Sequence, residues 1–330
     1  MIHPQLKLLP VPWQAALSPL PPTILSALRT EEPLKMHTTL RVGGPAQLFY
    51  HAQSRDLLAQ LAIAVQQGGV PVMVLGDGSN VCFSDRGVRG LVIRNGCTNA
   101  TVAPRADVDA GHSLMRLFQK SLNAELTGLE WAVGIPGTVG GALVSNAGAY
   151  GGNICDLVSS IDVIERGERK TVSPDWMEFS YRDSRLRRDD TRPAILLGAE
   201  LELSSGNRRE IRLKARDIQY QRICKQPWEP SAGSFFKNIH DHALADSMPG
   251  LPPLFKQRGV VTSAFLIDKC GLKGFRIGDA AVSARHANFI VNMGAATAAD
   301  VRALAATVRS TVNERFGISL EEEVLYSGDW

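Results

Sequence analysis

The chain has few cysteines and no strong excess of charge, and these absences exclude several classes of protein. The five cysteines stand at positions 82, 97, 155, 224 and 270 and form no CxxC pair, so neither a metal site nor a disulfide framework is indicated. The net charge is only +3 and no long basic run occurs, although residues 182–188 are locally basic. Binding to nucleic acid is therefore not predicted.

Long apolar segments are also missing. No run reaches the roughly 18–20 residues that are needed to span a bilayer. The N-terminus lacks a basic start followed by an unbroken apolar core, and prolines at positions 4, 10, 12, 19, 21 and 22 argue against a signal peptide. We therefore expect a cytoplasmic protein that does not bind membranes.

Glycine, in contrast, is concentrated in one stretch. Between Gly134 and Gly152 the chain reads GIPGTVGGALVSNAGAYGG, in which seven of nineteen residues are glycine. Glycine permits positive φ and a close approach of the backbone to a ligand, but it loses more conformational entropy on folding. Because the run has no lysine, arginine or histidine, one interpretation is a loop that binds phosphate through backbone N–H groups. The alternative is a set of tight turns, and glycine content alone does not decide between them.

At 330 residues the chain is long enough for two or three domains. Residues 1 to about 35 are predicted to form a proline-punctuated extension with one short helix near 23–29. Strands at 47–51 and 70–75 are predicted on either side of a helix at 55–67, which suggests a small α/β unit. The segment GDGSN that follows is not the dinucleotide fingerprint, because no helix is expected after it.

Later segments alternate in the same way. A helix is expected at about 113–123, strands at 160–165 and 194–203, and a charged helix at 208–222. The segment KQPWEP at 225–230 breaks the pattern and indicates a domain boundary. Beyond it we expect a strand at 288–292 and a helix at 298–316, with Thr297 and Asp300 at its N-cap and Gly317 at its end.

Seven motifs, taken in order, resemble those of the UDP-N-acetylenolpyruvoylglucosamine reductase family. They extend from about Met36 to Gly328 and read TTLRVGGPA (38–46), LGDGSN (75–80), GLEWAVGIPGTVGGALVSNAGAYGG (128–152), YRDS (181–184), PSAGSFFKN (230–238), GLKGFRIGDAAVSARHANFIVN (271–292) and LEEEV (320–324). Each is weak alone, but seven in the family order leave little room for coincidence. The short loop at 185–192 resembles the subclass without a long tyrosine-bearing loop, and 240–263 is longer than in compact members.

The resemblance implies an α+β protein. It comprises an FAD-binding fold of the vanillyl-alcohol-oxidase (PCMH) type in two subdomains and a separate α/β substrate-binding domain. The implied ranges are an N-terminal extension at 1–35, an FAD-binding region at 36–222 with subdomains of about 36–90 and 91–222, a substrate-binding domain at 223–318, and a tail at 319–330 that returns to the active site.

The implied activity is the NADPH-dependent, FAD-mediated reduction of UDP-N-acetylglucosamine enolpyruvate to UDP-N-acetylmuramate in peptidoglycan precursor synthesis. The protein is expected to be a monomer. FAD is expected to be non-covalent, because the glycine motifs contain no histidine or cysteine. The residues expected to bind it are Gly76, Asp77, Gly78, Ser79, Asn80, Gly134, Ile135, Pro136, Gly137, Thr138, Gly141, Asn146, Ala147 and Gly148.

Three residues match catalytic positions of the family. Arg182 would stabilise negative charge beside the enolpyruvyl carboxylate, which its forked guanidinium suits. Ser234 matches the proton donor, and a hydroxyl needs neighbouring charges to act as an acid. Glu323 would polarise the enolpyruvyl group, in a neutral form that requires a raised pKa. Glu321 and Glu322 are expected on a solvated face.

Asn238, Lys237 and Lys225 are the expected ligands of the UDP moiety, since lysine suits a pyrophosphate. His286 is expected to have a structural role. Two other functions stay open, namely another FAD-dependent oxidoreductase of the same fold that acts on a small alcohol or sugar, and a non-catalytic nucleotide-sugar binding protein. The three catalytic matches argue against both, and reduction of the flavin by NADPH would distinguish them from the reductase.

Overall fold

The computed structural model describes residue 6 and residues 9–188 and 194–330. The chain divides into two compact units, with unit 1 made of Met1–Glu32, Ala46–Asp77 and Arg89–Cys224, and unit 2 of Pro33–Pro45, Gly78–Val88 and Lys225–Trp330. The boundary between the longest segment of unit 1, Arg89–Cys224, and the longest segment of unit 2, Lys225–Trp330, falls at the start of the KQPWEP segment. Residues 36–45 and 78–88, which lie inside the predicted FAD-binding region, belong to unit 2.

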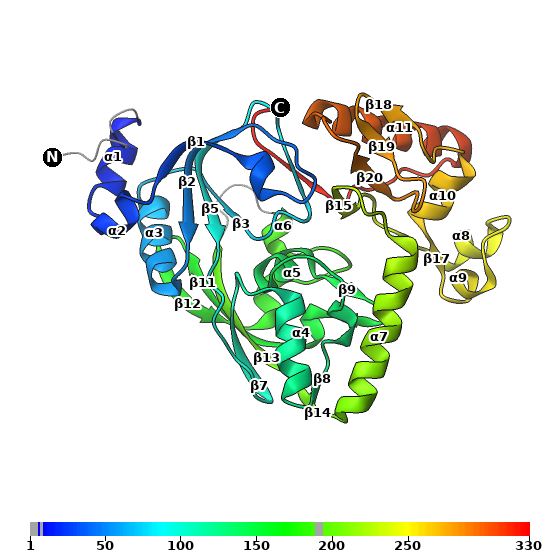
Figure 1. The fold of residues 1–330 in the computed structure, drawn as a ribbon, viewed down its shortest axis with the longest axis horizontal. Coiled ribbons are helices and arrows are strands. Elements are labelled where there is room, and N and C mark those ends of the chain that lie inside the picture. Colours follow the sequence, from blue (N-terminus) through cyan, green and yellow to red (C-terminus); the bar gives the residue numbers. More distant parts are fainter. Residues whose placement is uncertain (1–5, 7–8, 189–193) are drawn as a thin grey trace. The chain divides into compact units, whose positions relative to one another are not determined.

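Unit 1 contains two main sheets (Figure 1). The first is four-stranded, in the order β1 (Arg29–Pro33), β2 (Pro45–Ala52), β5 (Val88–Asn95) and β3 (Val72–Leu75), with β3 and β5 parallel. The second is antiparallel, in the order β12 (Glu168–Val172), β11 (Val158–Glu165), β13 (Ile195–Glu202), β7 (Arg105–Asp109) and β6 (Ala100–Thr101). Unit 1 also contains two short two-stranded antiparallel sheets. One pairs β8 (Leu126–Thr127) with β14 (Ser204–Ser205), and the other pairs β9 (Gly148–Ala149) with β10 (Gly152–Asn153).

The helices of unit 1 follow the predicted apolar spacing. Helix α3 (Arg55–Gln67) buries Leu58, Leu61 and Val65 on one face and ends at Gly68. The other helices are α4 (Leu114–Asn123), which Ser113 caps, α5 (Val139–Ser145), α6 (Arg185–Arg188) and α7 (Arg208–Lys225). Residues 189–192 of the predicted short loop lie outside the described residues.

The segment predicted as an N-terminal extension is largely part of unit 1 and packs against the rest of that unit. It forms α1 (Val11–Leu17), α2 (Pro22–Leu25) and β1, and Leu17, Ile24 and Leu28 are buried in one hydrophobic core with residues of α3. A Cβ on Gly68, at the end of α3, would collide with Ala16 of α1. The prolines start helices here, because Pro12 and Pro22 occupy first-turn positions that need no N–H partner.

This packing predicts that two alanine substitutions in α1 lower the free energy of unfolding by different amounts. Leu17 is fully buried, whereas Val11 is 75% exposed. Leu17→Ala is expected to lower the free energy of unfolding by about 2–5 kcal/mol, as for other large-to-small core changes. Val11→Ala should change it by less than about 0.5 kcal/mol. Urea unfolding of both variants measures the difference, and equal midpoints would contradict the packing of α1.

Unit 2 is built on one antiparallel sheet in the order β15 (Ser231–Ser234), β20 (Phe289–Asn292), β19 (Ala280–Val282) and β18 (Arg276–Ile277). The long helix α11 (Ala298–Phe316) has the predicted bounds, the predicted capping box of Thr297 with Asp300, and Gly317 at its end. Residues 240–263 form α8 (His242–Ser247) and α9 (Pro253–Gln257), and β16 (Ile239–His240) pairs with β17 (Val260–Val261). Helix α10 (Ser263–Lys269) follows, and β21 (Leu325–Ser327) pairs in parallel with β4 (Val81–Phe83).

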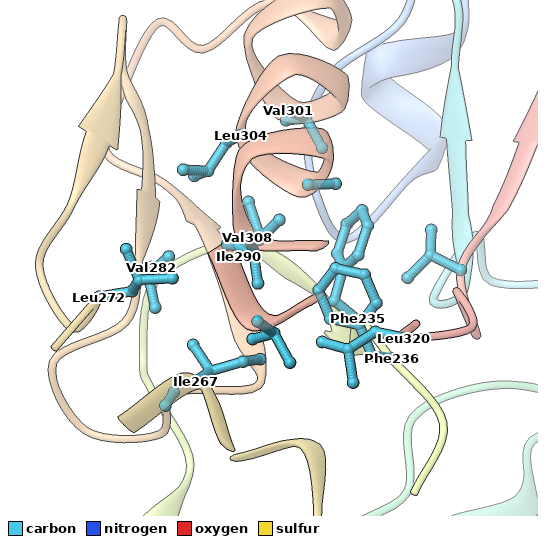
Figure 2. Packing of buried hydrophobic residues seen from close by; sticks show 14 of the residues in the cluster. Phe235, Phe236, Ile267, Leu272, Val282, Ile290, Val301, Leu304, Val308 and Leu320 are labelled. Carbon is cyan, nitrogen blue, oxygen red and sulfur yellow. The ribbon is translucent and has the colours of Figure 1, made fainter. Parts of the chain in front are cut away.

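The core of unit 2 lies between α11 and this sheet. Figure 2 shows Val301, Leu304 and Val308 of the helix facing the strand residues Val282 and Ile290. Phe235, Phe236 and Leu320, which Figure 2 also labels, belong to the same cluster and lie in the segments of unit 2 that contain Ser234 and Glu323. Within the described residues, no helix is long and apolar enough to cross a membrane, and no cluster of three potential metal ligands occurs.

Candidate active site

The glycine-rich run is a loop followed by a helix, and this helix was not predicted. Thr138 caps α5, since its Oγ1 accepts a hydrogen bond of 3.2 Å from Gly141 N. Gly140 N donates to Ala110 O at 2.7 Å, and a Cβ on Gly140 would lie 3.0 Å from the Ala110 side chain. The interpretation as tight turns alone was therefore wrong for 139–145, where small residues let the helix pack closely against the end of β7.

The two predicted cofactor loops meet inside unit 1. A Cβ on Gly76, directly after β3, would lie 2.5 Å from Thr138 Oγ1 at the start of α5. The amides of Gly134 and Gly137 have no hydrogen-bond partner among the described residues. Bare backbone with unused N–H donors is what a bound pyrophosphate requires, so these residues fit FAD. Asp77 carries a carboxylate 3.6 Å from the guanidinium of Arg94.

The second half of the first loop, 78–80, belongs to unit 2. Gly78 has φ +63°, and its carbonyl accepts a hydrogen bond of 3.1 Å from Thr39 N. Asn80 binds the C-terminal tail twice, because its Nδ2 donates to Glu323 O at 3.1 Å and its carbonyl accepts from Leu325 N at 3.1 Å. The side chain of Asn80, predicted to bind FAD, therefore also positions the segment that carries Glu323.

Arg182 is held by the end of the glycine-rich run. Its guanidinium donates to Asn146 O at 3.2 Å and to Gly148 O, and it lies over the ring of Tyr181. Asn146 Nδ2 in turn donates to Ser180 O at 2.8 Å. Two residues predicted to bind FAD, Asn146 and Gly148, thus orient the predicted catalytic arginine. The backbone of Arg182 has φ +52°, a rare conformation for a bulky residue that is often found at functional sites.

The neighbouring arginines behave differently. Arg185 pairs with Glu165 at 2.7 Å, and Arg188 pairs with Asp183 at 2.9 Å and with Glu178 at 3.0 Å. These are ion pairs with carboxylates at partly exposed positions. Arg188 also donates to the backbone carbonyl of Glu178 at 3.2 Å, whereas the two hydrogen bonds described for Arg182 both go to carbonyls of the glycine-rich run.

Ser234 ends β15 directly after a bulge. Three steps along β15, from Ser231 to Ser234, match two steps along β20, from Val291 to Phe289. The extra residue is accommodated at Gly233, whose φ of +82° a side chain would strain. A Cβ on Gly233 would lie 4.0 Å from Ser79 O, so the bulge lies against the first cofactor loop.

The segment that carries Glu323 pairs, in a short antiparallel stretch, with the two residues that follow Ser234. Glu323 N donates to Phe235 O at 2.8 Å, and Phe236 forms a bridge with Glu322. Within unit 2 the backbone of Glu323 is therefore held by Asn80 and by Phe235, the residue that follows Ser234. The predicted raised pKa of Glu323 stays a prediction.

The three glutamates of LEEEV have different environments. The Glu321 carboxylate is 71% exposed and lies 2.5 Å from Lys237 Nζ. Burial raises the pKa of Glu322 above its usual range, and the positive charges of Arg309 and Arg302 oppose this. Glu322 is only partly exposed, so the expectation of a solvated face is wrong for this residue, whereas it holds for Glu321.

Two of the three predicted substrate ligands, Lys237 and Asn238, already bind other residues of the protein. The Lys237 side chain is only 9% exposed and its ammonium is bound to Glu321. Asn238 Oδ1 accepts a hydrogen bond of 3.2 Å from Ser263 N, and Lys225 is exposed at the end of α7. As ligands of UDP the three residues stay predictions, but Lys237 would first have to leave its partner.

Sequence reasoning missed Asn288, which fixes the chain after Ser234. This buried amide accepts from Phe236 N at 3.0 Å and donates to Phe236 O at 2.8 Å, and its carbonyl accepts from Phe235 N at 2.7 Å. The available signal was an asparagine between Ala287 and the apolar residues 289–291, because an amide in an apolar segment needs hydrogen-bond partners.

His286 contacts neighbouring residues within unit 2, and is predicted to make stability depend on pH; its expected structural role stays a prediction. Its Nδ1 accepts from Asn288 N at 3.3 Å and its ring meets Phe289 edge-on at 4.8 Å. Burial, aided by the charges of Lys273 and Lys225, lowers the imidazole pKa below its ordinary 6.5. The unfolded chain then binds more protons between this lowered pKa and 6.5, so stability falls as pH falls through that range.

His286→Asn keeps an acceptor but does not titrate, and should lose less stability than wild type between pH 7 and pH 5. Denaturant unfolding across this range measures the difference. His242→Asn, at an exposed histidine of unit 2, is the control and should follow the wild-type curve. Parallel curves for wild type and His286→Asn would contradict the prediction.

Comparison with known proteins agrees with these features. Residues 225–327 match the family described as UDP-N-acetylenolpyruvoylglucosamine reductase, C-terminal domain, and residues 45–172 match an FAD binding domain family. The chain is 41% identical over 302 residues to UDP-N-acetylenolpyruvoylglucosamine reductase 2 of Symbiobacterium thermophilum, covering 90% of this chain and 91% of that protein. It is 37% identical over 306 residues to the reductase of Caldanaerobacter subterraneus, covering 92% and 94%.

A solved structure leads to the same family. The UDP-N-acetylenolpyruvylglucosamine reductase of Thermus caldophilus superposes with a TM-score of 0.71 at 34% identity, covering 91% of this chain and 97% of that one. The predicted family and the predicted fold class are confirmed. The chain therefore belongs to the UDP-N-acetylenolpyruvoylglucosamine reductase family, with an FAD-binding domain and the C-terminal domain of that family.

Proposed function

We propose that this protein is a flavin-dependent oxidoreductase that uses NADPH to reduce UDP-N-acetylglucosamine enolpyruvate to UDP-N-acetylmuramate, a step of peptidoglycan precursor synthesis. Family membership supports the reaction. The observation that carries the assignment is the arrangement in unit 2, where the backbone of Glu323 is bound to Asn80 and to Phe235, the neighbour of Ser234 in the chain. The presence of all three residues that match catalytic positions, Arg182, Ser234 and Glu323, argues against a protein that only binds the nucleotide-sugar.

The glycine loops would hold FAD through their backbone amides, with Thr138 and Gly76 in contact at the junction of the two loops. When bound, FAD supplies the capacity to accept a hydride and to donate it. The role of the protein is then to orient the nucleotide-sugar, to stabilise the charge that develops on it, and to provide a proton.

Arg182 is proposed to bind the carboxylate of the enolpyruvyl group. Addition of hydride to the vinyl carbon places negative charge on the neighbouring carbon and carboxylate, and a fixed guanidinium lowers the free energy of that state. The carbonyls of Asn146 and Gly148 hold the guanidinium in place before substrate arrives, so little reorganisation is needed. This is the electrostatic preorganisation that makes such a donor effective.

Ser234 is proposed to give the proton to the carbon next to the carboxylate. The bulge at Gly233 sets the direction of the Ser234 side chain, and Glu323 lies on the neighbouring segment. Glu323 is proposed to polarise the enolpyruvyl group. The roles of Asn238 and Lys225 as ligands of the UDP moiety, and the monomeric state, are part of the same proposal.

The test is NADPH consumption by the purified yellow protein, with and without UDP-N-acetylglucosamine enolpyruvate. We expect steady consumption only when the nucleotide-sugar is present, with one UDP-N-acetylmuramate formed for each NADPH oxidised. Slow reduction of the flavin by NADPH, together with oxygen consumption on a small alcohol or sugar, would instead indicate an oxidase. A colourless protein that FAD cannot reconstitute would exclude both activities.

A further inference from the structure

Arg222, near the C-terminal end of α7, has a buried donor without an acceptor. Its Nε is buried and has no hydrogen-bond partner in the described part of the chain, and no carboxylate there pairs with its guanidinium. The contact it does make is with the ring of Tyr150, 5.7 Å from Cζ to the ring centroid. Because an unmade hydrogen bond of a buried charged group is costly, native proteins seldom leave one without a reason.

The surroundings of Arg222 are those of the predicted cofactor loop. A Cβ on Gly134, the first glycine of the glycine-rich run, would lie 2.9 Å from Arg222 Cδ, so the arginine stem packs on bare backbone. Burial lowers the pKa of Arg222; Tyr150 counteracts this in part, and the positive charge of Arg182 adds to it. Two guanidinium groups near enough to repel each other favour an anion that would neutralise both.

The other arginines of α7 do not share these features. Arg216 lies 3.4 Å from Asp217, and Arg208 donates to Asn123 Oδ1 at 3.2 Å, both at exposed positions. Arg212 is exposed as well. Arg222 therefore differs from them in combining a buried donor with a neighbouring positive charge.

We propose that Arg222 is an anion-binding residue of the site, and that its guanidinium binds an oxyanion of FAD or of the enolpyruvyl nucleotide-sugar. The proposal rests on the proposed function, which supplies both ligands. Contact with Gly134 favours FAD, because the amide of that glycine is one of the unused donors of the cofactor loop. The Nε–H and Nη–H groups of one arginine suit the two oxygens of a phosphate or carboxylate.

Stability without ligand separates this role from a structural one. After removal of FAD, Arg222→Met should have a Tm equal to or above that of wild type, because an apolar side chain of similar length removes a buried donor that has no acceptor. With FAD added, wild type should gain more in Tm than the variant. If Arg222 serves only to hold α7 in place, Arg222→Met and Arg222→Lys should both melt lower than wild type without FAD, which would overturn the proposal.

Affinity for each ligand identifies the anion. FAD release from the diluted holoenzyme is followed by free flavin fluorescence, and binding of the nucleotide-sugar by the change in flavin absorbance at saturating FAD. Arg222→Met should weaken binding of one ligand about 10- to 100-fold, the range for one lost hydrogen bond to a charged group. Arg222→Lys should weaken it less, since the charge remains, and Arg212→Gln should match wild type.

A loss confined to FAD assigns the oxyanion to the cofactor, and a loss confined to the nucleotide-sugar assigns it to the substrate. Wild-type affinity of Arg222→Met for both ligands would overturn the proposal and leave the proposed function intact. Failure of the wild-type protein to bind FAD at all would instead remove the proposed function, so the two failures are distinguishable.

Discussion

Ser234→Ala is expected to lower turnover of UDP-N-acetylglucosamine enolpyruvate by about 10²–10⁴-fold, the usual contribution of a positioned proton donor. Reduction of the flavin by NADPH should be unchanged, because this half of the reaction needs no proton from Ser234. Stopped-flow absorbance of the flavin measures the two halves separately. The variant should therefore reach the reduced state at the wild-type rate and then be reoxidised slowly by the nucleotide-sugar.

Ser231→Ala is the matched control for this experiment. Ser231 lies at the other end of β15, where it pairs with Val291 and its backbone carbonyl accepts from Thr39 Oγ1 at 2.7 Å. The substitution should keep both half-reactions. Equal reoxidation rates for Ser234→Ala and wild type would remove Ser234 from the mechanism, and a variant that also loses reduction by NADPH would indicate a disturbed site.

Gly78→Ala is expected to cause the second large effect, loss of FAD. At φ +63° an L-residue is strained by roughly 1–2 kcal/mol. In addition, the new Cβ would lie 2.8 Å from Thr38 Cα and nearer still to His37 O, so backbone must move. That movement would displace Ser79 and Asn80, and we expect the protein to purify without yellow colour and to bind added FAD at least about 100-fold more weakly, a loss of roughly 2.7 kcal/mol.

Gly69→Ala provides a control with the same backbone strain. Gly69 also has φ +63°, but nothing lies within 4 Å of its Cβ position. This variant should lose a similar amount of intrinsic stability and still purify with FAD. Absorbance of the purified proteins near the flavin maximum compares the two, and equal FAD content would show that the clash at Gly78 can be relieved without disturbing the loop.

Two long amphipathic helices could be predicted from sequence with the bounds that the structure shows, whereas α7 continues to Lys225, beyond the predicted 208–222. Helices α3 and α11 have regular apolar spacing and end at Gly68 and Gly317, and Thr297 starts the second. These signals are local, since apolar period and caps act within a few residues. In the folded chain each of these helices buries the face on which the sequence places apolar residues, so the tertiary packing agrees with the local pattern.

Two features of the fold were not predicted, because the local composition favoured other structures. Helix α5 is rich in glycine, which disfavours helices by up to about 1 kcal/mol per residue, yet it forms where Gly140 must approach Ala110 closely. The N-terminal prolines suggested an extension, but Leu17 and Ile24 are buried against unit 1. In both cases tertiary packing outweighed the local preference.

For the charged residues of the site as well, the sequence shows their identity, and only the fold shows their surroundings. Motif order selected Arg182, Ser234 and Glu323, but it carried no information about what surrounds them. Glu322 is half-buried with a raised pKa, and Lys237 already has a carboxylate partner. Burial and pairing depend on segments far apart in the sequence, such as 237 and 321, which no local pattern connects.

The sequence by itself determined the family, the glycine loops that fit a pyrophosphate, and which residue types are present for the chemistry. These properties follow from the order and identity of residues along the chain. The tertiary structure alone decided that Asn80 and Phe235 hold the Glu323 segment and that Asn146 and Gly148 orient Arg182. It also decided that Arg222 Nε is buried with no acceptor among the described residues, in a side chain that packs on Gly134. Hydrogen-bond satisfaction and desolvation are properties of packed neighbours, and these neighbours become known only once the chain is folded.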